Sequence, residues 1–308
     1  MLAEFSEEHV QPAMYRPYVK QFLYFDPILI HRPGVFPLTF PTHSALEENR
    51  VWHKVGDNWP FFVMCVDSIP DVLPQSGSQS FPFYTYAEDG THRRENITDW
   101  ALEQFRSHYH DTSITKWDIF HYIYAVLHHP EYRERYAANL RRELPRIPFT
   151  PVSSKPALSE AEGSPVVKDV EAFRELAKAG QRLAEIHVHY EKQPEYKLTK
   201  REKAGEKLNW RVTKMRLSKD KTTLIYNDFL TLSDIPKETY DYRLGNRSAL
   251  EWIIDQYQVS TDKRSGITND PNRADDPQYI LRLIGQVIAV SLETVKIVRS
   301  LPTLGLAD

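Results

Sequence analysis

The chain has 308 residues, of which 41% are hydrophobic and 26% charged, and its formal net charge is −3. No run approaches the roughly 20 apolar residues of a membrane span, and residues 1–10 hold carboxylates instead of the basic start and apolar centre of a signal peptide. The single cysteine, Cys65, excludes an internal disulfide and a multi-cysteine zinc site. We therefore expect a globular cytoplasmic protein of one large domain or two ordinary ones.

The first third of the chain favours strands. Four segments there are short, rich in aromatic or branched side chains, and bounded by Pro, Gly, Asn or Asp. Prolines such as Pro27 and Pro37 place some of these segments at sheet edges or in extended loops. The predicted strands are residues 22–30, 50–55, 61–66 and 80–86.

Three helices are predicted next. Asn96 with Asp99 indicates the cap of a first helix, and Thr115 with Asp118 indicates a capping box for a second. Pro130 favours the start of a third helix, which two later prolines close. Along this third helix an apolar residue recurs every four positions: Tyr132, Tyr136, Leu140 and Leu144.

Residues 150–167 differ from their surroundings. They are rich in Pro, Ser, Ala and Glu and lack a periodic apolar pattern, which predicts a disordered insert. From Asp169 an apolar stripe at helical spacing predicts a long helix that ends before Pro194.

A basic segment follows this helix. Residues 197–221 hold ten Lys and Arg against three Asp and Glu, a local balance of +7. Alternation in residues 210–217 and 222–225 predicts a β-hairpin with residues 218–221 as its turn. Such a charge run is commonly only a solvated face, and that alternative stays open.

The C-terminal third is predicted to be helical. Ser248 with Glu251 forms a capping box, after which four residues share one helical face: Leu250, Ile253, Ile254 and Tyr257. Residues 245–247 form a polar shoulder before this helix, and residues 260–273 form a loop of turn formers and donors after it. Asp275 or Asp276 is expected to cap a last helix with Pro277 at its first position.

Four long stretches also carry a resemblance. They are residues 15–26 (YRPYVKQFLYFD), 117–149 (WDIFHYIYAVLHHPEYRERYAANLRRELPRIPF), 179–191 (AGQRLAEIHVHYE) and 244–273 (LGNRSALEWIIDQYQVSTDKRSGITNDPNR). Together they resemble the C-terminal specificity region of the type ISP restriction-modification enzymes, single polypeptides that join nuclease, helicase, adenine methyltransferase and target recognition domain. The match spans nearly the whole chain and is more specific than a short catalytic motif.

The elements and the resemblance together give an α+β fold with a β-rich N-terminal part, helices, a basic β-hairpin and a helical C-terminal part. Residues 1–14 would be a tail at the junction to a missing methyltransferase domain. The other expected divisions are a β-rich target recognition part with a helical pair (15–149), the disordered insert (150–167), and a helical and hairpin specificity part (168–308).

Catalytic motifs are not found in the sequence. It lacks a phosphate-binding Gly-x-x-x-x-Gly-Lys-Ser/Thr loop, a Gly-x-Gly-x-x-Gly loop and a His-Glu-x-x-His motif. It also lacks the Asn/Asp-Pro-Pro-Tyr/Phe motif by which adenine methyltransferases hold the flipped base. The resemblance thus implies S-adenosylmethionine, ATP and Mg²⁺ only for the missing methyltransferase and helicase domains of a parent enzyme, which would be partners of this chain.

The resemblance implies that the chain recognises a specific sequence of double-stranded DNA while the target adenine is flipped elsewhere. Cations on the predicted hairpin would contact phosphates, and donors around the capped helix would contact base edges. Arg16 and Lys20 lie in the family-like Tyr-Arg-Pro motif, although Arg16 could instead be buried in a salt bridge at a domain junction. The predicted phosphate contacts are Lys214, Arg216, Lys219 and Lys221, and the predicted base contacts are Asn246, Arg247, Lys263, Arg264 and Arg273.

Two other functions stay open. In one, the chain is a structural coupler between methyltransferase and helicase motor, with little base contact of its own. In the other, Glu195-Tyr196-Lys197 and the carboxylate of Asp71 would form a metal-dependent nuclease site, although such short matches are common by chance. Histidines 108, 110, 121 and 128 are expected to be core or surface residues and not metal ligands.

Overall fold

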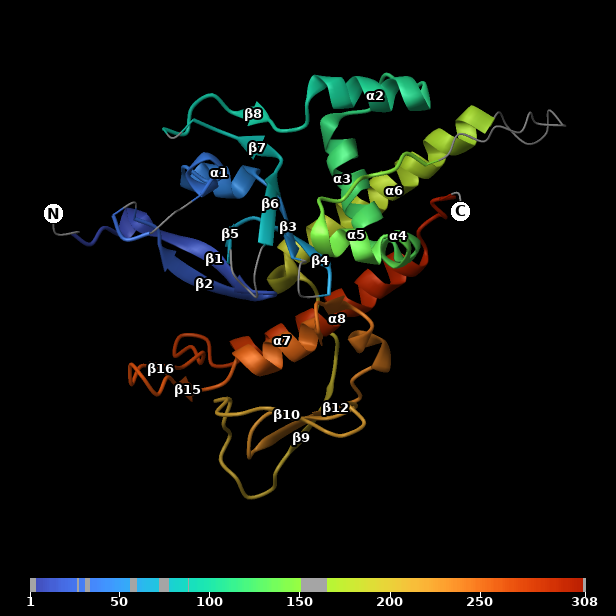
Figure 1. Cartoon of the computed structure of the whole chain (residues 1–308). Coiled ribbons are helices and arrows are strands. Elements are labelled where there is room, and N and C mark those ends of the chain that lie inside the picture. The colour runs from blue at the N-terminus through green and yellow to red at the C-terminus, as the bar shows by residue number, and fades with distance from the viewer. Residues whose placement is uncertain are drawn as a thin grey trace. The chain divides into compact units, whose positions relative to one another are not determined.

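The computed structural model describes residues 4–26, 28–30, 34–55, 60–71, 78–87, 89–150 and 165–306. It contains both sheets and helices, so the predicted α+β class with a β-rich N-terminal part and helical C-terminal part is confirmed (Figure 1). The chain divides into two compact units, described separately below. Unit 1 takes residues 1–15, 20–188 and 297–308, and unit 2 takes residues 16–19 and 189–296.

Unit 1 begins with two small sheets and a short ribbon. The first sheet has the order β2-β1-β5, with β5 parallel to β1, and the second has the antiparallel order β4-β3-β6. The strands are β1 (Val10–Arg16), β2 (Val19–Tyr24), β3 (Val51–Val55), β4 (Phe62–Val66), β5 (Ile69–Pro70), β6 (Ser78–Pro82), and the paired β7 (Tyr84–Thr85) and β8 (Arg94–Glu95).

Two of the four predicted strands are confirmed as β3 and β4. The strand predicted at 22–30 is shifted, because β2 starts at Val19 and the chain turns after Tyr24, where the Asp26 carboxylate accepts the Ile28 N–H at 2.6 Å. The strand predicted at 80–86 is divided into β6 and β7. Phe83, between them, is buried and stacks on Trp117 with ring centres 3.6 Å apart.

The helices of unit 1 build its core together with strands such as β4, which is buried along its length. The helices are α1 (His43–Glu48), α2 (Asp99–Tyr109), α3 (Lys116–His128), α4 (Pro130–Arg135), α5 (Ala137–Arg142) and α6 (Pro165–Val188). Helix α3 packs along α6, which also contacts β4 (Figure 1). The contact is close because Gly180 of α6 has no side chain: a Cβ there would lie 1.9 Å from the His121 carbonyl oxygen of α3.

The predicted caps of α2 and α3 have different outcomes. The capping box of Thr115 and Asp118 is confirmed at the start of α3. Helix α2 is capped instead by Thr98, whose hydroxyl accepts the Ala101 N–H at 3.1 Å. Asn96 is engaged elsewhere, since its side-chain amide donates to the Pro82 carbonyl at 3.0 Å.

The third predicted helix is two helices. It starts at Pro130 as expected, but it breaks at Tyr136 between α4 and α5. With this bend both Tyr132 and Leu140 are buried, whereas Leu144 lies beyond α5 and is exposed. An uninterrupted four-residue repeat in the sequence gave no sign of the break.

The predicted insert needs correction at both of its ends. Thr150 is buried: its N–H donates to the Tyr109 hydroxyl at 3.0 Å, and its own hydroxyl is hydrogen-bonded to the same group at 2.8 Å. Helix α6 begins at Pro165, so residues 165–167 are helical. Residues 151–164 lie outside the described part of the chain.

Unit 2 contains a four-stranded sheet of order β10-β11-β12-β9, two ribbons and two helices. The strands are β9 (Thr199–Glu202), β10 (Arg216–Leu217), β11 (Leu224–Ile225), β12 (Leu230–Ser233), β13 (Arg243–Leu244), β14 (Arg247–Ser248), β15 (Ser260–Thr261) and β16 (Thr268–Asn269). The helices are α7 (Ala249–Gln256) and α8 (Tyr279–Arg299). The last three residues of α8 belong to unit 1. Tyr18 from the start of the chain is fully buried in this unit, where its hydroxyl donates to that of Tyr242 at 3.0 Å.

The predicted basic hairpin exists as β10 and β11, with residues 218–223 as its turn, but it is shorter than expected. Residues 210–215 form no strand, because the side-chain amide of Asn227 donates to the carbonyls of Asn209 and Arg211 at 2.8 and 3.0 Å. These bonds occupy carbonyl groups that a strand ladder would need.

Helices α7 and α8 are both present where the sequence predicts them, but each differs from the prediction in one detail. The capping box of Ser248 and Glu251 is confirmed at the start of α7, but Ile254, predicted to be buried, is only half-buried. Helix α8 starts at Tyr279, two residues after the predicted Pro277, and the Asp276 carboxylate is bound by Arg282 at 2.9 Å. None of the helices in the described ranges is long and apolar enough to cross a membrane.

Candidate nucleic-acid interface

Arg247 of unit 2 is held by an ion pair and by an aromatic ring. It is the first residue of β14, directly before Ser248, which caps α7. Its Nη1 donates to the Asp255 carboxylate at 2.6 Å, and its guanidinium carbon lies 4.9 Å from the centre of the Trp252 ring. Within the described residues its remaining donors have no recorded protein partner, so a held and oriented guanidinium can present them to a ligand.

A shallow pocket of about 280 Å³ surrounds this arginine. Three residues that the sequence predicted for DNA contact, Lys214, Asn246 and Arg247, line it together. The other lining residues are Met215, Glu251, Ile254, Asp255 and Gln258, none of which was predicted as a site residue. The sequence gave no signal for them because they meet only after folding, from segments about 30 to 45 positions apart along the chain.

The pocket has charges of both signs. Two carboxylates, Glu251 and Asp255, lie among the cations, and a phosphate would meet repulsion there. Base edges suit the mixture better, since they offer amino donors to carboxylates and acceptors to Arg or Asn. Asn246 is exposed at the rim, with its main-chain carbonyl bound by Arg243.

Lys221, predicted to contact phosphate, is engaged with the start of α7. Its Nζ donates to Glu251 at 2.7 Å and lies 5.1 Å from the ring centre of Tyr240. Burial alone would raise the pKa of Glu251, but the hydrogen bonds from Lys221 and from Ser248 outweigh it and hold that pKa below its usual value. Lys221 therefore stabilises a charged capping carboxylate.

The other predicted phosphate contacts are free of such engagement. Lys214, Arg216 and Lys219 are exposed, and no ion pair is recorded for them in the described part of the chain. Lys200 and Arg201 on β9 share this character, and sequence reasoning missed them as site residues because their strand lacks apolar alternation. All five lie in unit 2, on β9 or on and next to β10. These two strands are the opposite edges of the four-stranded sheet.

Lys263 and Arg264 lie at the tip of the ribbon formed by β15 and β16, which extends from the end of α7 (Figure 1). Both are exposed. The tip is organised by Asp262, whose carboxylate accepts the Arg264 and Ser265 N–H groups at 3.0 and 2.7 Å. These bonds, those from Ser265 above all, lower the pKa of Asp262, so it stays charged and holds the turn.

The base of the ribbon is braced to the basic segment. Asn272 bonds to the main chain of Val212, and Arg211 forms an ion pair with Asp270 at 2.5 Å. The ribbon and the segment before Lys214 are thus one structural piece within unit 2.

The three remaining predicted contacts lie elsewhere. Lys20, in unit 1, forms an ion pair with Asp67 at 3.5 Å. Arg16 is half-buried at the end of β1 and has interactions of its own. Arg273 is exposed, but its guanidinium lies 3.3 Å from the ring centre of Tyr279, at the start of α8, and not at the ribbon tip.

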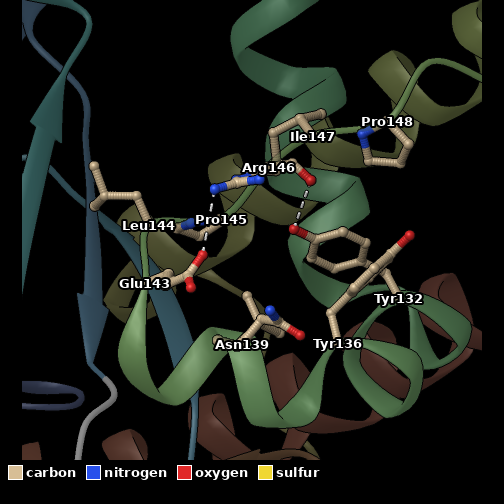
Figure 2. Close-up of a pocket in the computed structure, with 10 residues that line it drawn as sticks. Tyr132, Tyr136, Asn139, Glu143, Leu144, Pro145, Arg146, Ile147 and Pro148 are labelled. Atoms are coloured by element: carbon tan, nitrogen blue, oxygen red, sulfur yellow. Dashed lines mark hydrogen bonds and ion pairs between the residues drawn. The ribbon is translucent and has the colours of Figure 1, made fainter.

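A second pocket, of about 340 Å³, lies in unit 1 between helices α4 and α5 and the segment that follows them (Figure 2). Figure 2 shows the Tyr132 hydroxyl pointing to the Arg146 carbonyl, to which it donates at 2.9 Å, and Arg146 in an ion pair with Glu143 at 3.5 Å. Its charged groups are satisfied by each other, and it contains none of the predicted DNA contacts.

No metal centre is found in the part of the chain that the structure describes, because no three His, Cys, Asp or Glu side chains gather there. The Glu195-Tyr196-Lys197 segment packs on α8, with the Tyr196 N–H donating to the Gly285 carbonyl at 2.9 Å. His128 and His187 are buried side by side, their rings 5.5 Å apart, and burial holds the pKa of both below the usual value.

Comparison with known proteins gives one family and several structures. The family model described as the type ISP C-terminal specificity domain matches residues 2–283. No curated protein sequence matches the chain. Among solved structures, it is similar to a nuclease-deletion mutant of the type ISP restriction-modification enzyme LlaGI in complex with a DNA substrate mimic, with 34% identity and a TM-score of 0.77 over 98% of this chain.

Two further structures give the same result. The ATP-dependent type ISP restriction-modification enzyme LlaBIII bound to DNA has 30% identity and a TM-score of 0.81 over 98% of this chain. A DrdV–DNA complex has 34% identity and a TM-score of 0.82 over 97% of it. The chain spans 25%, 19% and 29% of the lengths of the LlaGI, LlaBIII and DrdV chains, respectively.

Proposed function

Because the chain belongs to the family of type ISP C-terminal specificity domains, we propose that it recognises a specific sequence in double-stranded DNA for a restriction-modification enzyme. The similar structures are complexes with DNA or a DNA mimic, which supports this ligand. Adenine methylation, DNA translocation and cleavage would then belong to other domains of the parent enzyme. S-adenosylmethionine, ATP and Mg²⁺ would serve those domains, and the cytoplasm is where such an enzyme would meet its DNA.

The observation that carries the proposal is the arrangement of Arg247. An arginine that is bound to a carboxylate and stacked on an indole loses little freedom when its other donors bind a base. A guanine offers two acceptors, O6 and N7, to such a guanidinium in the major groove. Asn246, beside it, has an exposed amide suited to an adenine.

The exposed cations complete the interface. Lys214, Arg216 and Lys219 would contact phosphates, which supplies affinity without sequence preference. Lys221 is a weaker candidate for this role, since binding a phosphate would separate it from Glu251. Lys20, paired with Asp67, and Arg273, placed on Tyr279, would have to leave these partners to bind DNA, and Arg16 has interactions of its own.

The coupler alternative has support of its own in unit 1. Several large apolar side chains near the start of the chain are exposed, Phe5 and Phe22 to 74% and 80%. Apolar exposure of this extent is typical of surfaces that pack against another domain. We propose that this region contacts the methyltransferase or helicase domain, a role compatible with DNA recognition by unit 2.

Binding measurements separate recognition from coupling. The whole chain would be incubated with a pool of random duplexes, and bound duplexes would be recovered and sequenced over several rounds. A recognition domain enriches one sequence and binds it with an affinity that falls as salt rises. A pure coupler enriches none and shows no salt-sensitive affinity.

A further inference from the structure

Ile267 lies at the tip of the β15–β16 ribbon and is 69% exposed. A single exposed apolar side chain is ordinary on a protein surface. Ile267 is unusual because of its setting: it follows Gly266, precedes the first residue of β16, and lies within four positions of two exposed cations, Lys263 and Arg264.

The tip holds Ile267 in a defined position. The Asp262 N–H donates to the Ile267 carbonyl at 2.9 Å, and the Gly266 N–H donates to the Asp262 carbonyl at 2.9 Å. Gly266 has a φ of +70°, which glycine adopts at little cost and which closes the turn. Below the tip, the hydroxyls of Thr261 and Thr268 are hydrogen-bonded across the ribbon at 2.8 Å.

The turn is therefore formed without a ligand. A ligand that contacts Ile267 need not order the loop, so little binding free energy is lost to conformational entropy. The one carboxylate of the tip, Asp262, is exposed but accepts main-chain N–H groups, and together with Lys263 and Arg264 it leaves the tip with a net charge of +1. The outer surface of the tip is thus cationic with one apolar side chain.

This combination fits the major groove of DNA. The groove admits a two-stranded β-ribbon, its walls are phosphates, and the only apolar group that it displays is the 5-methyl group of thymine. Resting on the proposed function, we infer that Ile267 is a specificity-determining residue that contacts the 5-methyl group of a thymine in the recognised sequence. Lys263 and Arg264, the predicted base contacts at the same tip, would contact neighbouring base edges in the groove.

The test removes the apolar group from each side of the contact in turn: the 5-methyl group from the DNA, and the side chain of Ile267 beyond its Cβ from the protein. After the recognised sequence has been selected, each thymidine in turn is replaced by deoxyuridine, which lacks only the 5-methyl group of the base. At one position the substitution weakens binding of the unaltered chain by about fourfold, the effect of losing one buried methyl group. Ile267→Ala weakens binding to the thymine duplex and is insensitive to deoxyuridine at the same position, while Ile267→Val keeps part of the discrimination.

Ile28→Ala is the matched control. Ile28 is 57% exposed in unit 1, and its replacement leaves the deoxyuridine effect unchanged. The melting temperature of Ile267→Ala stays that of the unaltered chain, because little apolar area is buried at the tip. The inference is overturned if no thymine is sensitive to deoxyuridine, or if Ile267→Ala retains the full deoxyuridine effect. Selection of a sequence with either of these results leaves the proposed function standing, whereas failure to enrich any sequence contradicts both.

Discussion

The side-chain amide of Asn272 pairs with both main-chain polar groups of Val212. Its Nδ2 donates to the Val212 carbonyl at 2.8 Å, and its Oδ1 accepts the Val212 N–H at 2.8 Å. This pair joins the base of the β15–β16 ribbon to the segment that leads to Lys214. Together with the ion pair of Arg211 and Asp270, this side chain connects the ribbon to one wall of the Arg247 pocket.

Replacing Asn272 by Ala should loosen this connection. Two half-buried hydrogen bonds are lost, which predicts a decrease of roughly 1–3 kcal/mol in the free energy of unfolding. Urea denaturation would measure it. Asn269→Ala is the control, because the Asn269 side chain is exposed and makes no recorded hydrogen bond in the described ranges. Equal stability of the two variants would show that the brace is unimportant.

Burial differs between two neighbouring isoleucines of α7, and so should the cost of removing them. Ile253 is fully buried, so Ile253→Ala is expected to lower the free energy of unfolding by about 2–5 kcal/mol. Ile254 is half-buried at the pocket, so Ile254→Ala should cost distinctly less. Thermal or urea unfolding compares them. A larger loss for Ile254→Ala would contradict the orientation of the helix.

The same helix shows what the sequence determines. The capping box is local, because Ser248 and Glu251 are three residues apart, and the sequence predicts it without knowledge of the fold. The apolar stripe predicts a buried face only approximately. Ile254 lies at the edge of the stripe, about 100° around the helix from Ile253, and only the surrounding elements decide that this edge faces a pocket.

The candidate site was predictable in its residue types but not in its assembly. Local turn chemistry identified Asn246 and Arg247, and the charge run identified Lys214. The pocket that these residues share forms only when segments distant along the chain come together in the fold. The same holds for the pairing of Lys221 with Glu251, which would compete with the predicted phosphate contact of Lys221. The short extent of β10 likewise depends on a distant amide, that of Asn227, which no local pattern reveals.

Gly180 is expected to tolerate substitution poorly. In Gly180→Ala the new Cβ would meet the His121 carbonyl, so α3 and α6 must separate, and overpacking of this kind costs about 1–3 kcal/mol or more. Thermal unfolding is the measurement. Gly285→Ala in α8 is the control, since its Cβ would have 3.1 Å to its nearest neighbours and should cost less. A melting temperature unchanged by Gly180→Ala would refute the close helix contact.

Acid should destabilise unit 1 through its buried histidines. Burial lowers the pKa of His187 to about 3 and, despite the opposing charge of Asp71, that of His53 to about 4. Unfolded, both have a pKa near 6.5. Below about pH 6.5 the unfolded chain therefore binds more protons than the folded chain, and each group lowers the free energy of unfolding by about 1.4 kcal/mol per pH unit until its folded pKa is reached.

Urea unfolding at about pH 7.5 and about pH 5.5 tests this sign. The unaltered chain should be less stable at the lower pH. His187→Gln removes one of the titrating groups and should show a smaller loss over the same interval. Equal stability of the unaltered chain at both values would mean that these histidines are protonated or exposed in the folded protein.

The most direct test of DNA recognition by unit 2 compares two sets of cations on two duplexes. Binding of the selected duplex and of a scrambled one is measured at several salt concentrations for Arg216→Ala and Lys219→Ala, and for Arg247→Ala and Arg264→Ala. The first pair should lose affinity equally on both duplexes and lower the salt slope by about one unit each. Arg247→Ala should cost about 1–3 kcal/mol more on the selected duplex than on the scrambled one. Equal losses on both duplexes for Arg247→Ala and Arg264→Ala would contradict base recognition by this surface.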